Sequence, residues 1–83
     1  MYRVEVRPAA SRELDRIDTQ SRERILAAIR ELGRDPRPGG CLKLASSELW
    51  RIRVGDYRVV YEIRDQVLLV LVVRVAHRRE AYR

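Results

Sequence analysis

The spacing of hydrophobic residues changes twice along this chain, and that change constrains the fold more than any other feature. Apolar and polar residues alternate from position 2 to 7, recur at helical spacing from 10 to 32, and alternate again from 49. A period of two is typical of a strand with one buried face, whereas apolar residues at i, i+4 and i+7 indicate an amphipathic helix. The sequence therefore predicts one strand, a helical region and then a run of strands.

The boundaries of the helical region are marked by residues that start or stop helices. Pro8 ends the first strand and suits the first turn of a helix. Asp18 and Thr19 provide a break and a cap before a second helix. Gly33 is placed to end that helix, and the prolines at 36 and 38 prevent it from resuming. We expect two short antiparallel helices that need a surface to pack on.

Three strands are expected in the second half of the chain. Gly55 and Asp56 separate two alternating runs, and glycine in the first of two turn positions suits a type II′ hairpin. Asp65 and Gln66 form the next tight turn. Residues 67–75 are apolar on both faces, which indicates an inner strand covered on both sides.

This element order defines an α+β fold. The order β-α-α-β-β-β gives a small, antiparallel-rich sheet with a two-helix hairpin packed on one face. Residues 35–40 are rich in proline and glycine, and we interpret them as a connector because neither side could bury a core alone. We therefore expect residues 1–83 to form a single domain, with only about 60% of the unfolded surface buried on folding.

The charge of the chain points to an anionic partner. It has 18 Lys and Arg against 12 Asp and Glu, giving a net charge of +6 and a pI near 10.4, and Lys43 is the only lysine. Arginine presents a planar fork that suits phosphate, so nucleic acid or an acidic protein would fit. A genome rich in G and C explains the arginine bias equally well, so composition alone does not decide the partner.

The remaining composition indicates a soluble cytoplasmic protein. Cys41 is the only cysteine, which excludes an internal disulfide or a thiolate metal cluster and fits a reducing cytosol. The charged N-terminus does not resemble a signal peptide. The longest apolar run, residues 67–73, is far short of the roughly 20 residues of a membrane helix, so we expect no membrane partner.

Several arginines are expected on one face of the sheet. Alternation puts Arg51 and Arg53 opposite in direction to Trp50, and the tight hairpin brings Arg58 alongside them. Close like charges destabilise a sheet, so a structural explanation must say why they are tolerated. Scattered, solvated arginines remain the alternative.

Two segments then resemble a known family. Residues 49–61 read LWRIRVGDYRVVY, and residues 72–82 read VVRVAHRREAY. With the N-terminal strand, the helices and the segment 35–38, they resemble the RelE family of bacterial toxins over essentially the whole chain. The resemblance implies the toxin of a type II toxin–antitoxin system, a ribosome-dependent endoribonuclease that cleaves mRNA in the ribosomal A site and is neutralised by a cognate antitoxin. The positions that would carry the family's function are Arg51, Arg53, Arg58, Arg78 and Tyr82.

The chain departs from the family pattern at two points. Some relatives have lysines where this chain has Arg51 and Arg53, and arginine keeps the charge but cannot give up a proton. His77 precedes Arg78, and a histidine near this position is involved in only part of the superfamily.

RNA can be cleaved by attack of its own 2′-hydroxyl, without a metal or cofactor. The step needs a base, an acid and positive charge near the phosphorane. A single histidine excludes a two-histidine mechanism, and no cluster of Asp, His and Cys suggests a metal site. We therefore expect a metal-independent, cofactor-free enzyme in which Arg51, Arg53 and Arg58 hold the scissile phosphate. Arg78 would lie at the leaving oxygen, and Tyr82 would stack on a base or accept the 2′-hydroxyl proton.

Other interpretations stay open. ParE-like toxins share this scaffold but inhibit DNA gyrase, and a basic RNA-binding module without catalysis is a weaker alternative. Tyr82 could instead cover the sheet edge, and we expect His77 to be a turn residue or a hydrogen-bond partner. The remaining aromatics are expected to pack in the core, and two further arginines are left outside the site: Trp50, Tyr57 and Tyr61, then Arg74 and Arg79.

Overall fold

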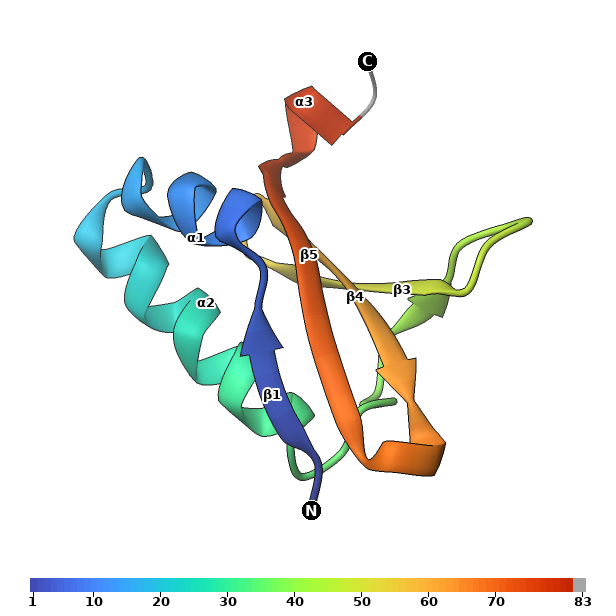
Figure 1. The fold of residues 1–83 in the computed structure, drawn as a ribbon. Coiled ribbons are helices and arrows are strands. Elements are labelled where there is room, and N and C mark those ends of the chain that lie inside the picture. Colours follow the sequence, from blue (N-terminus) through green and yellow to red (C-terminus); the bar gives the residue numbers. More distant parts are fainter. Residues whose placement is uncertain (82–83) are drawn as a thin grey trace.

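The computed structural model describes residues 1–81, and the side chains of residues 1–79. Two helices cover one side of a mixed five-stranded sheet, and a short helix follows the last strand (Figure 1). The elements are β1 (Arg3–Val6), α1 (Pro8–Asp15), α2 (Thr19–Leu32), β2 (Leu42–Lys43), β3 (Leu49–Val54), β4 (Tyr57–Arg64), the 3-10 turn η1 (Asp65–Val67), β5 (Leu69–His77) and α3 (Arg78–Ala81). The α+β class and the predicted element order are confirmed, with β2 and α3 added.

The strands lie in the order β1-β5-β4-β3-β2. β1 pairs with β5 in parallel, and every other pairing is antiparallel. β5 is an inner strand between β1 and β4, as its apolar run predicts. It begins at Leu69, two residues later than expected, because the turn after β4 is longer than Asp65-Gln66 and ends at Leu68 with φ 52°.

The helices form where capping residues and apolar stripes predict them. Pro8 is the first residue of α1, and the Asp18 carboxylate caps α2 by accepting the Ser21 backbone N–H at 3.0 Å. The buried residues of both helices pack against the sheet in one core. These helix residues are Ala10, Leu14, Ile25, Ile29 and Leu32.

Gly33 ends α2 for a reason that the sequence does not reveal. Its φ of −67° is ordinary helical backbone, so the left-handed conformation common at helix ends is not used here. A Cβ atom at this position would lie 3.0 Å from the Tyr2 carbonyl oxygen and 3.2 Å from Val4 Cγ2. Glycine is therefore needed because β1 passes directly over the end of α2.

The β3–β4 hairpin has the predicted turn and the predicted faces. Gly55 has a φ of 59° whereas Asp56 does not have a positive φ, which fits a type II′ turn rather than type I′. Trp50 lies opposite Tyr61, and Ile52 opposite Val59, on the face that packs under the helices. The expected core role of the aromatics is confirmed: Tyr61 is fully buried, and Trp50 and Tyr57 pack against the core.

A β-bulge changes which side chains of β5 face the helices. The register with β4 passes from Arg74 opposite Val60 to Val72 opposite Tyr61, so Val73 is the extra residue. Val72 and Val75 can therefore both lie in the core although their parity differs. In the part of β5 before the bulge, Leu69 and Leu71 point to the sheet face opposite the helices and are still buried. The bulge and this second apolar face account for the continuous apolar run of the sequence.

Within the described residues, no helix is long and apolar enough to cross a membrane.

Candidate functional site

Three of the predicted site residues lie on the face of the hairpin that points away from the core. Arg53 is directly opposite Arg58 in the β3–β4 register. Arg51 has the same parity as Arg53 and is opposite Val60. The strand alternation therefore predicted that these arginines lie on the face opposite the core, where the structure has them.

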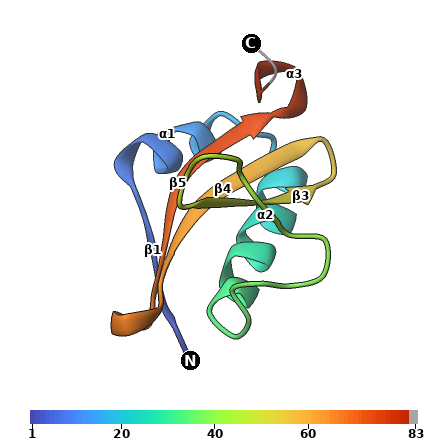
Figure 2. The same ribbon diagram turned by 90° about the vertical axis from the view of Figure 1, so that its right-hand side faces the viewer.

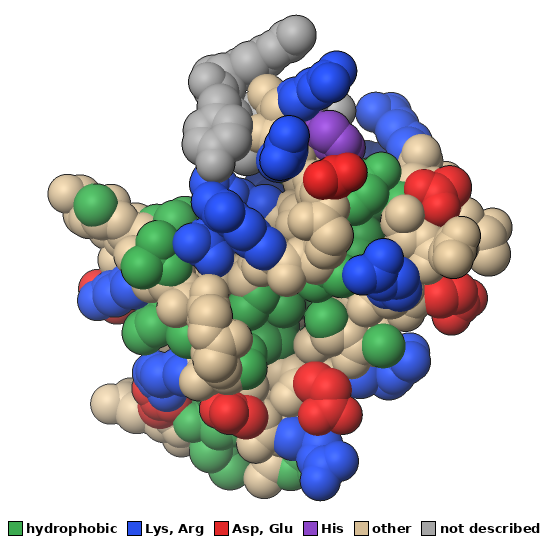
Figure 3. Space-filling view, turned by 180° about the vertical axis from the view of Figure 1, so that it is seen from behind, with side chains coloured by type: hydrophobic (Ala, Val, Ile, Leu, Met, Phe, Trp, Pro, Cys, Tyr) green, Lys and Arg blue, Asp and Glu red, His purple; other side chains and the backbone are tan. Residues whose placement is uncertain are grey.

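A cavity of about 360 Å³ lies at the turn end of this hairpin. It is lined by four arginines together with the turn residues Gly55 and Asp56 and the first residue of β4, Tyr57; the arginines are Arg53, Arg58, Arg78 and Arg79. We call this cavity the arginine pocket. Lys and Arg side chains also gather at this end of the molecule when it is seen from behind, above a stretch of hydrophobic side chains (Figure 3).

The backbone at the start of α3 brings Arg78 to the pocket. The Arg78 N–H donates a 2.7 Å hydrogen bond to the carbonyl oxygen of Asp56 in the hairpin turn. This bond extends the β4–β5 ladder by one residue and fixes α3 above the turn (Figure 2). The two segments that resemble the RelE family are therefore joined at the pocket, although more than 20 residues of sequence separate Asp56 from Arg78.

Of the other two predicted residues, one is described by the structure, and it does not line the pocket. Arg51 lies further along β3, and its Nη1 donates to the Gly40 carbonyl oxygen at 3.1 Å. It is thus directed toward the loop before β2 and does not line the cavity. Tyr82 lies outside the described residues, so its expected role stays a prediction.

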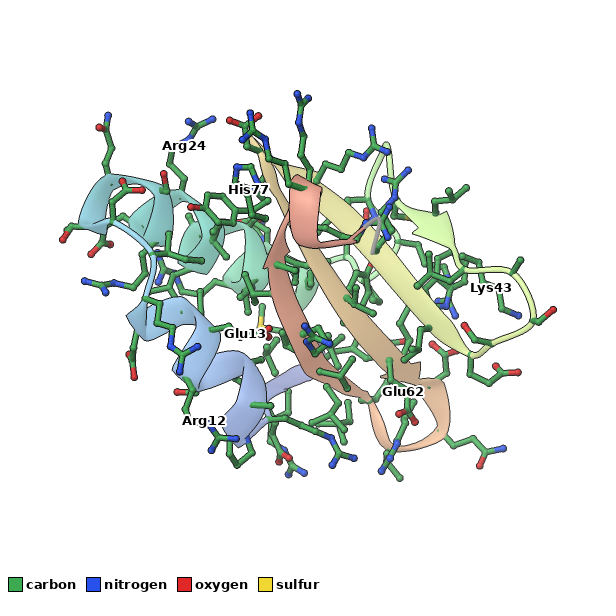
Figure 4. The ribbon with its side chains drawn as sticks, turned by 90° about the horizontal axis from the view of Figure 1, so that it is seen from above. Arg12, Glu13, Arg24, Lys43, Glu62 and His77 are labelled. Atoms are coloured by element: carbon green, nitrogen blue, oxygen red, sulfur yellow. The ribbon has the colours of Figure 1, made fainter. Side chains whose placement is uncertain are left out.

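His77 is a hydrogen-bond partner, as expected from the sequence. Its Nδ1 accepts the Arg79 backbone N–H at 3.2 Å. Its ring meets the Tyr57 ring edge-on, with centroids 5.3 Å apart and planes at 89°. His77 borders a separate cavity of about 290 Å³ on the helix side of the sheet, which Glu13 of α1 and the following Arg16 also line (Figure 4).

Arg79 and Arg74, which the sequence could not place, have different environments. Arg79 lines the arginine pocket and is a candidate that sequence reasoning missed. Arg74 forms an ion pair with Glu13 of α1, with Nη2 and Oε2 3.0 Å apart. The Glu13 carboxylate also accepts the Val75 N–H at 2.8 Å, on the part of β5 beyond its pairing with β1. The adjacent pair Arg78-Arg79 after a strand was the only sequence signal for Arg79, and strand parity could not extend into a helix.

The fold and the pocket define a small basic α+β protein with a positively charged cavity at one end of its hairpin. Among the described residues, no cluster of His, Cys, Asp and Glu could hold a metal ion. Among the described residues that line the pocket, the charged side chains are four arginines and Asp56, so their net charge is positive.

Known proteins identify the family. The sequence model of the ParE toxin of type II toxin–antitoxin system, parDE, matches residues 4–82. Toxin RelG of Mycobacterium tuberculosis (strain ATCC 25618 / H37Rv) is 35% identical to this chain in an alignment that covers 99% of this chain and 97% of that protein. The chain belongs to the RelE/ParE family of toxins of type II toxin–antitoxin systems.

Solved structures agree with this assignment. The archaeal RelE–RelB complex from Pyrococcus horikoshii OT3 matches with a TM-score of 0.83 and 25% identity, over 93% of this chain and 94% of that one. The toxin–antitoxin complex RelBE2 from M. tuberculosis matches with a TM-score of 0.80 and 28% identity, over 92% of this chain and 96% of that one. The RelE-like fold expected from the sequence is confirmed.

Proposed function

We propose that this toxin is a metal-independent endoribonuclease that cleaves mRNA in the ribosomal A site and so inhibits translation. The observation that carries the proposal is the convergence of Arg53, Arg58, Arg78 and Arg79 on one cavity. A cleaved phosphodiester gains negative charge in the transition state, and donors already oriented toward that charge lower the barrier. Guanidinium groups suit this task because they bind phosphate oxygens in a bidentate manner and stay charged.

Each arginine has a proposed part in holding the scissile phosphate. Arg53 and Arg58 would bind its non-bridging oxygens from the hairpin face. Arg78 would approach the leaving 5′-oxygen from the other wall, with its backbone held by Asp56. Arg51, further along β3, would bind an adjacent phosphate of the same strand.

The proton transfers are assigned to other groups. The guanidinium group of arginine is always protonated in proteins and cannot act as a base at neutral pH. Tyr82 is proposed to stack on a base or to accept the 2′-hydroxyl proton, since nearby positive charge favours the phenolate form. Much of the rate would come from alignment, with the ribosome bending the mRNA for in-line attack. Activity on free RNA should therefore be low.

Cleavage on translating ribosomes tests the proposal. Mapping mRNA 5′ ends should show cuts at a fixed codon phase with wild-type toxin. Arg78→Ala should slow cleavage by about 10²- to 10³-fold, the usual cost of removing one donor to a developing anion. Arg34→Ala is the matched control, because Arg34 follows the end of α2, does not line the pocket and forms an exposed ion pair with Glu31. Cleavage by Arg78→Ala or Tyr82→Phe as fast as wild type would overturn the residue assignment.

Gyrase inhibition is the second candidate function, because the matching family model is that of the ParE toxin. The arginine pocket favours RNA cleavage, where its charge has a phosphate to act on. A DNA supercoiling assay separates the two functions. Inhibition of gyrase by the purified toxin, with mRNA left intact on ribosomes, would replace the ribonuclease proposal.

We also propose a cognate antitoxin as the protein partner. Two of the similar structures are complexes of RelE and RelB proteins, and the partner of this chain would be their counterpart. An acidic or amphipathic segment, ordered on binding, would fit the net charge of +6 and cover the arginine face. Both the antitoxin and the ribosomal substrate would place the toxin in the cytoplasm.

A further inference from the structure

The side chain of His77 lies at the junction between β5 and α3, where the chain turns into the arginine pocket. We propose that His77 is a positioning residue: its Nδ1 holds the backbone of Arg79 and thereby sets where the guanidinium groups of Arg78 and Arg79 lie. The inference rests on the proposed function for its catalytic consequence, although the positioning itself can be tested without cleavage.

Two hydrogen bonds fix the first turn of α3. The Arg78 N–H donates to the Asp56 carbonyl oxygen at 2.7 Å, and the Arg79 N–H donates to His77 Nδ1 at 3.2 Å. The first N–H groups of a helix have no partner within it, and a helix of four residues cannot hold its own shape in water. The position of both arginines therefore depends on these two anchors.

The imidazole ring is itself held in place. Tyr57 is the cross-strand partner of His77, and the two rings meet edge-on at 5.3 Å. Tyr57 lines the arginine pocket as well as the cavity on the helix side. The aromatic contact thus orients the ring so that Nδ1, and not Nε2, faces the Arg79 N–H. Accepting this bond requires the neutral ring with its proton on Nε2.

His77 acts through Arg79 because it does not line the arginine pocket. Its ring borders the opposite cavity, together with Glu13, Arg16, Ile17 and Val75. A general acid or base must come within hydrogen-bond reach of the reacting oxygen, and the arginine-bound phosphate would be on the other side of the sheet.

Three substitutions of His77 distinguish the role of Nδ1 from that of Nε2. His77→Asn keeps an acceptor at the place of Nδ1, His77→Gln moves the acceptor to the place of Nε2, and His77→Phe keeps the ring edge on Tyr57 without any acceptor. Single-turnover mRNA cleavage on stalled ribosomes should fall about 10- to 100-fold for Gln and Phe, since small misplacement of aligned groups has costs of this size. Asn should stay within about threefold of wild type, that is within roughly 0.7 kcal/mol.

The outcomes that overturn the inference are distinct. Wild-type cleavage by His77→Phe would show that the bond does not matter, and His77→Asn as slow as His77→Phe would show that the Nδ1 acceptor is not the cause. Activity in His77→Gln alone would indicate chemistry at Nε2 instead. If His77→Phe fails to fold, the comparison of Asn with Gln still decides.

A second measurement does not depend on catalysis. Hydrogen exchange of the Arg78 and Arg79 amides in the isolated toxin should be faster in His77→Gln and His77→Phe than in wild type and His77→Asn. Equal exchange in all four proteins would overturn the positioning role. If the wild-type toxin cuts no mRNA but the exchange pattern holds, the proposed function fails while the positioning role stands.

Discussion

Arg53 lies directly opposite Arg58 across the β3–β4 hairpin, so two like charges occupy one cross-strand pair. Opposed like charges destabilise a sheet, whereas a binding site for phosphate needs positive charge at a defined position. The pair therefore marks a place where the requirements of the site and those of the sheet conflict.

Replacing one of the two opposed arginines with a neutral residue should make the protein more stable and less active. Arg53→Thr should raise the free energy of unfolding by roughly 0.2–1 kcal/mol, the range for cross-strand pairs, while mRNA cleavage falls. Urea denaturation measures the first effect. Arg51→Thr is the stability control, because Arg51 faces Val60 and not another arginine. A loss of stability in Arg53→Thr would mean that the other contacts of Arg53 outweigh the repulsion.

The charge of the arginine face should also make antitoxin binding sensitive to salt. We expect the dissociation constant to rise as ionic strength increases, because screening over about 10 Å at 0.1 M weakens contacts between exposed charges. Titration calorimetry over a range of salt concentrations measures the dependence. The slope should be flatter for Arg58→Thr and unchanged for Arg34→Ala. Binding that does not vary with salt would contradict an electrostatic interface.

The contact of Gly33 with β1 should make this glycine intolerant of even one methyl group. Gly33→Ala should lower the free energy of unfolding by about 1–3 kcal/mol, the usual effect of overpacking, although alanine favours helix. The added Cβ would press on the Tyr2 carbonyl oxygen. Gly39→Ala is the matched control, since a Cβ there meets nothing within 4 Å. Equal stability of the two variants would show that β1 can shift without cost.

The buried Tyr61 hydroxyl should contribute to the free energy of unfolding through its hydrogen bond. It donates a 2.7 Å hydrogen bond to the Pro36 carbonyl oxygen, and burial raises the pKa of the phenol. Tyr61→Phe leaves that carbonyl without this donor, so the free energy of unfolding should fall by about 1–3 kcal/mol. Guanidinium denaturation measures the change. Proteolysis within residues 35–40 should also become faster, and unchanged proteolysis would mean that other contacts hold the loop.

Asp65 gives the stability a defined acid dependence. Hydrogen bonds from Arg37, with Nη2 2.9 Å from Oδ2, and from the Tyr2 hydroxyl lower the pKa of this carboxyl below its ordinary value of 3.8. A carboxyl whose pKa is lower in the folded state stabilises the protein above the unfolded pKa, and this contribution is lost as pH falls through the folded pKa. Asp65→Asn should therefore be less stable than wild type at pH 6, with the difference shrinking below about pH 4. A constant difference across this range would exclude the ionised carboxylate as the cause.

Strand alternation predicted the part of the site that lies on the hairpin. The spacing of Trp50 and Ile52 against Arg51 and Arg53 determined the faces, because successive side chains of a strand must point to opposite sides. The same rule could not predict that Arg51 does not line the pocket. The direction of a long side chain depends on nearby acceptors, here the Gly40 carbonyl oxygen.

The features that the sequence did not predict are short or depend on distant contacts. β2 has two residues and α3 has four, too few to produce a period. The bulge at Val73 appears only when β5 is aligned with β4. Arg79 enters the pocket because of the bonds at the start of α3, which no pattern in the sequence encodes.

The position of β5 between β1 and β4 has a consequence for the toxin during its synthesis. Of the five strands, the ribosome makes β5 last, yet it is the strand that joins β1 to the rest of the sheet, with Arg3 paired to Leu69. Contacts between residues so far apart in sequence form late in folding, because closing the long intervening loop costs entropy. The arginine pocket thus cannot assemble until residue 79 has emerged from the exit tunnel. Under the proposed function, a nascent chain would therefore have no complete site with which to cleave the mRNA that encodes it.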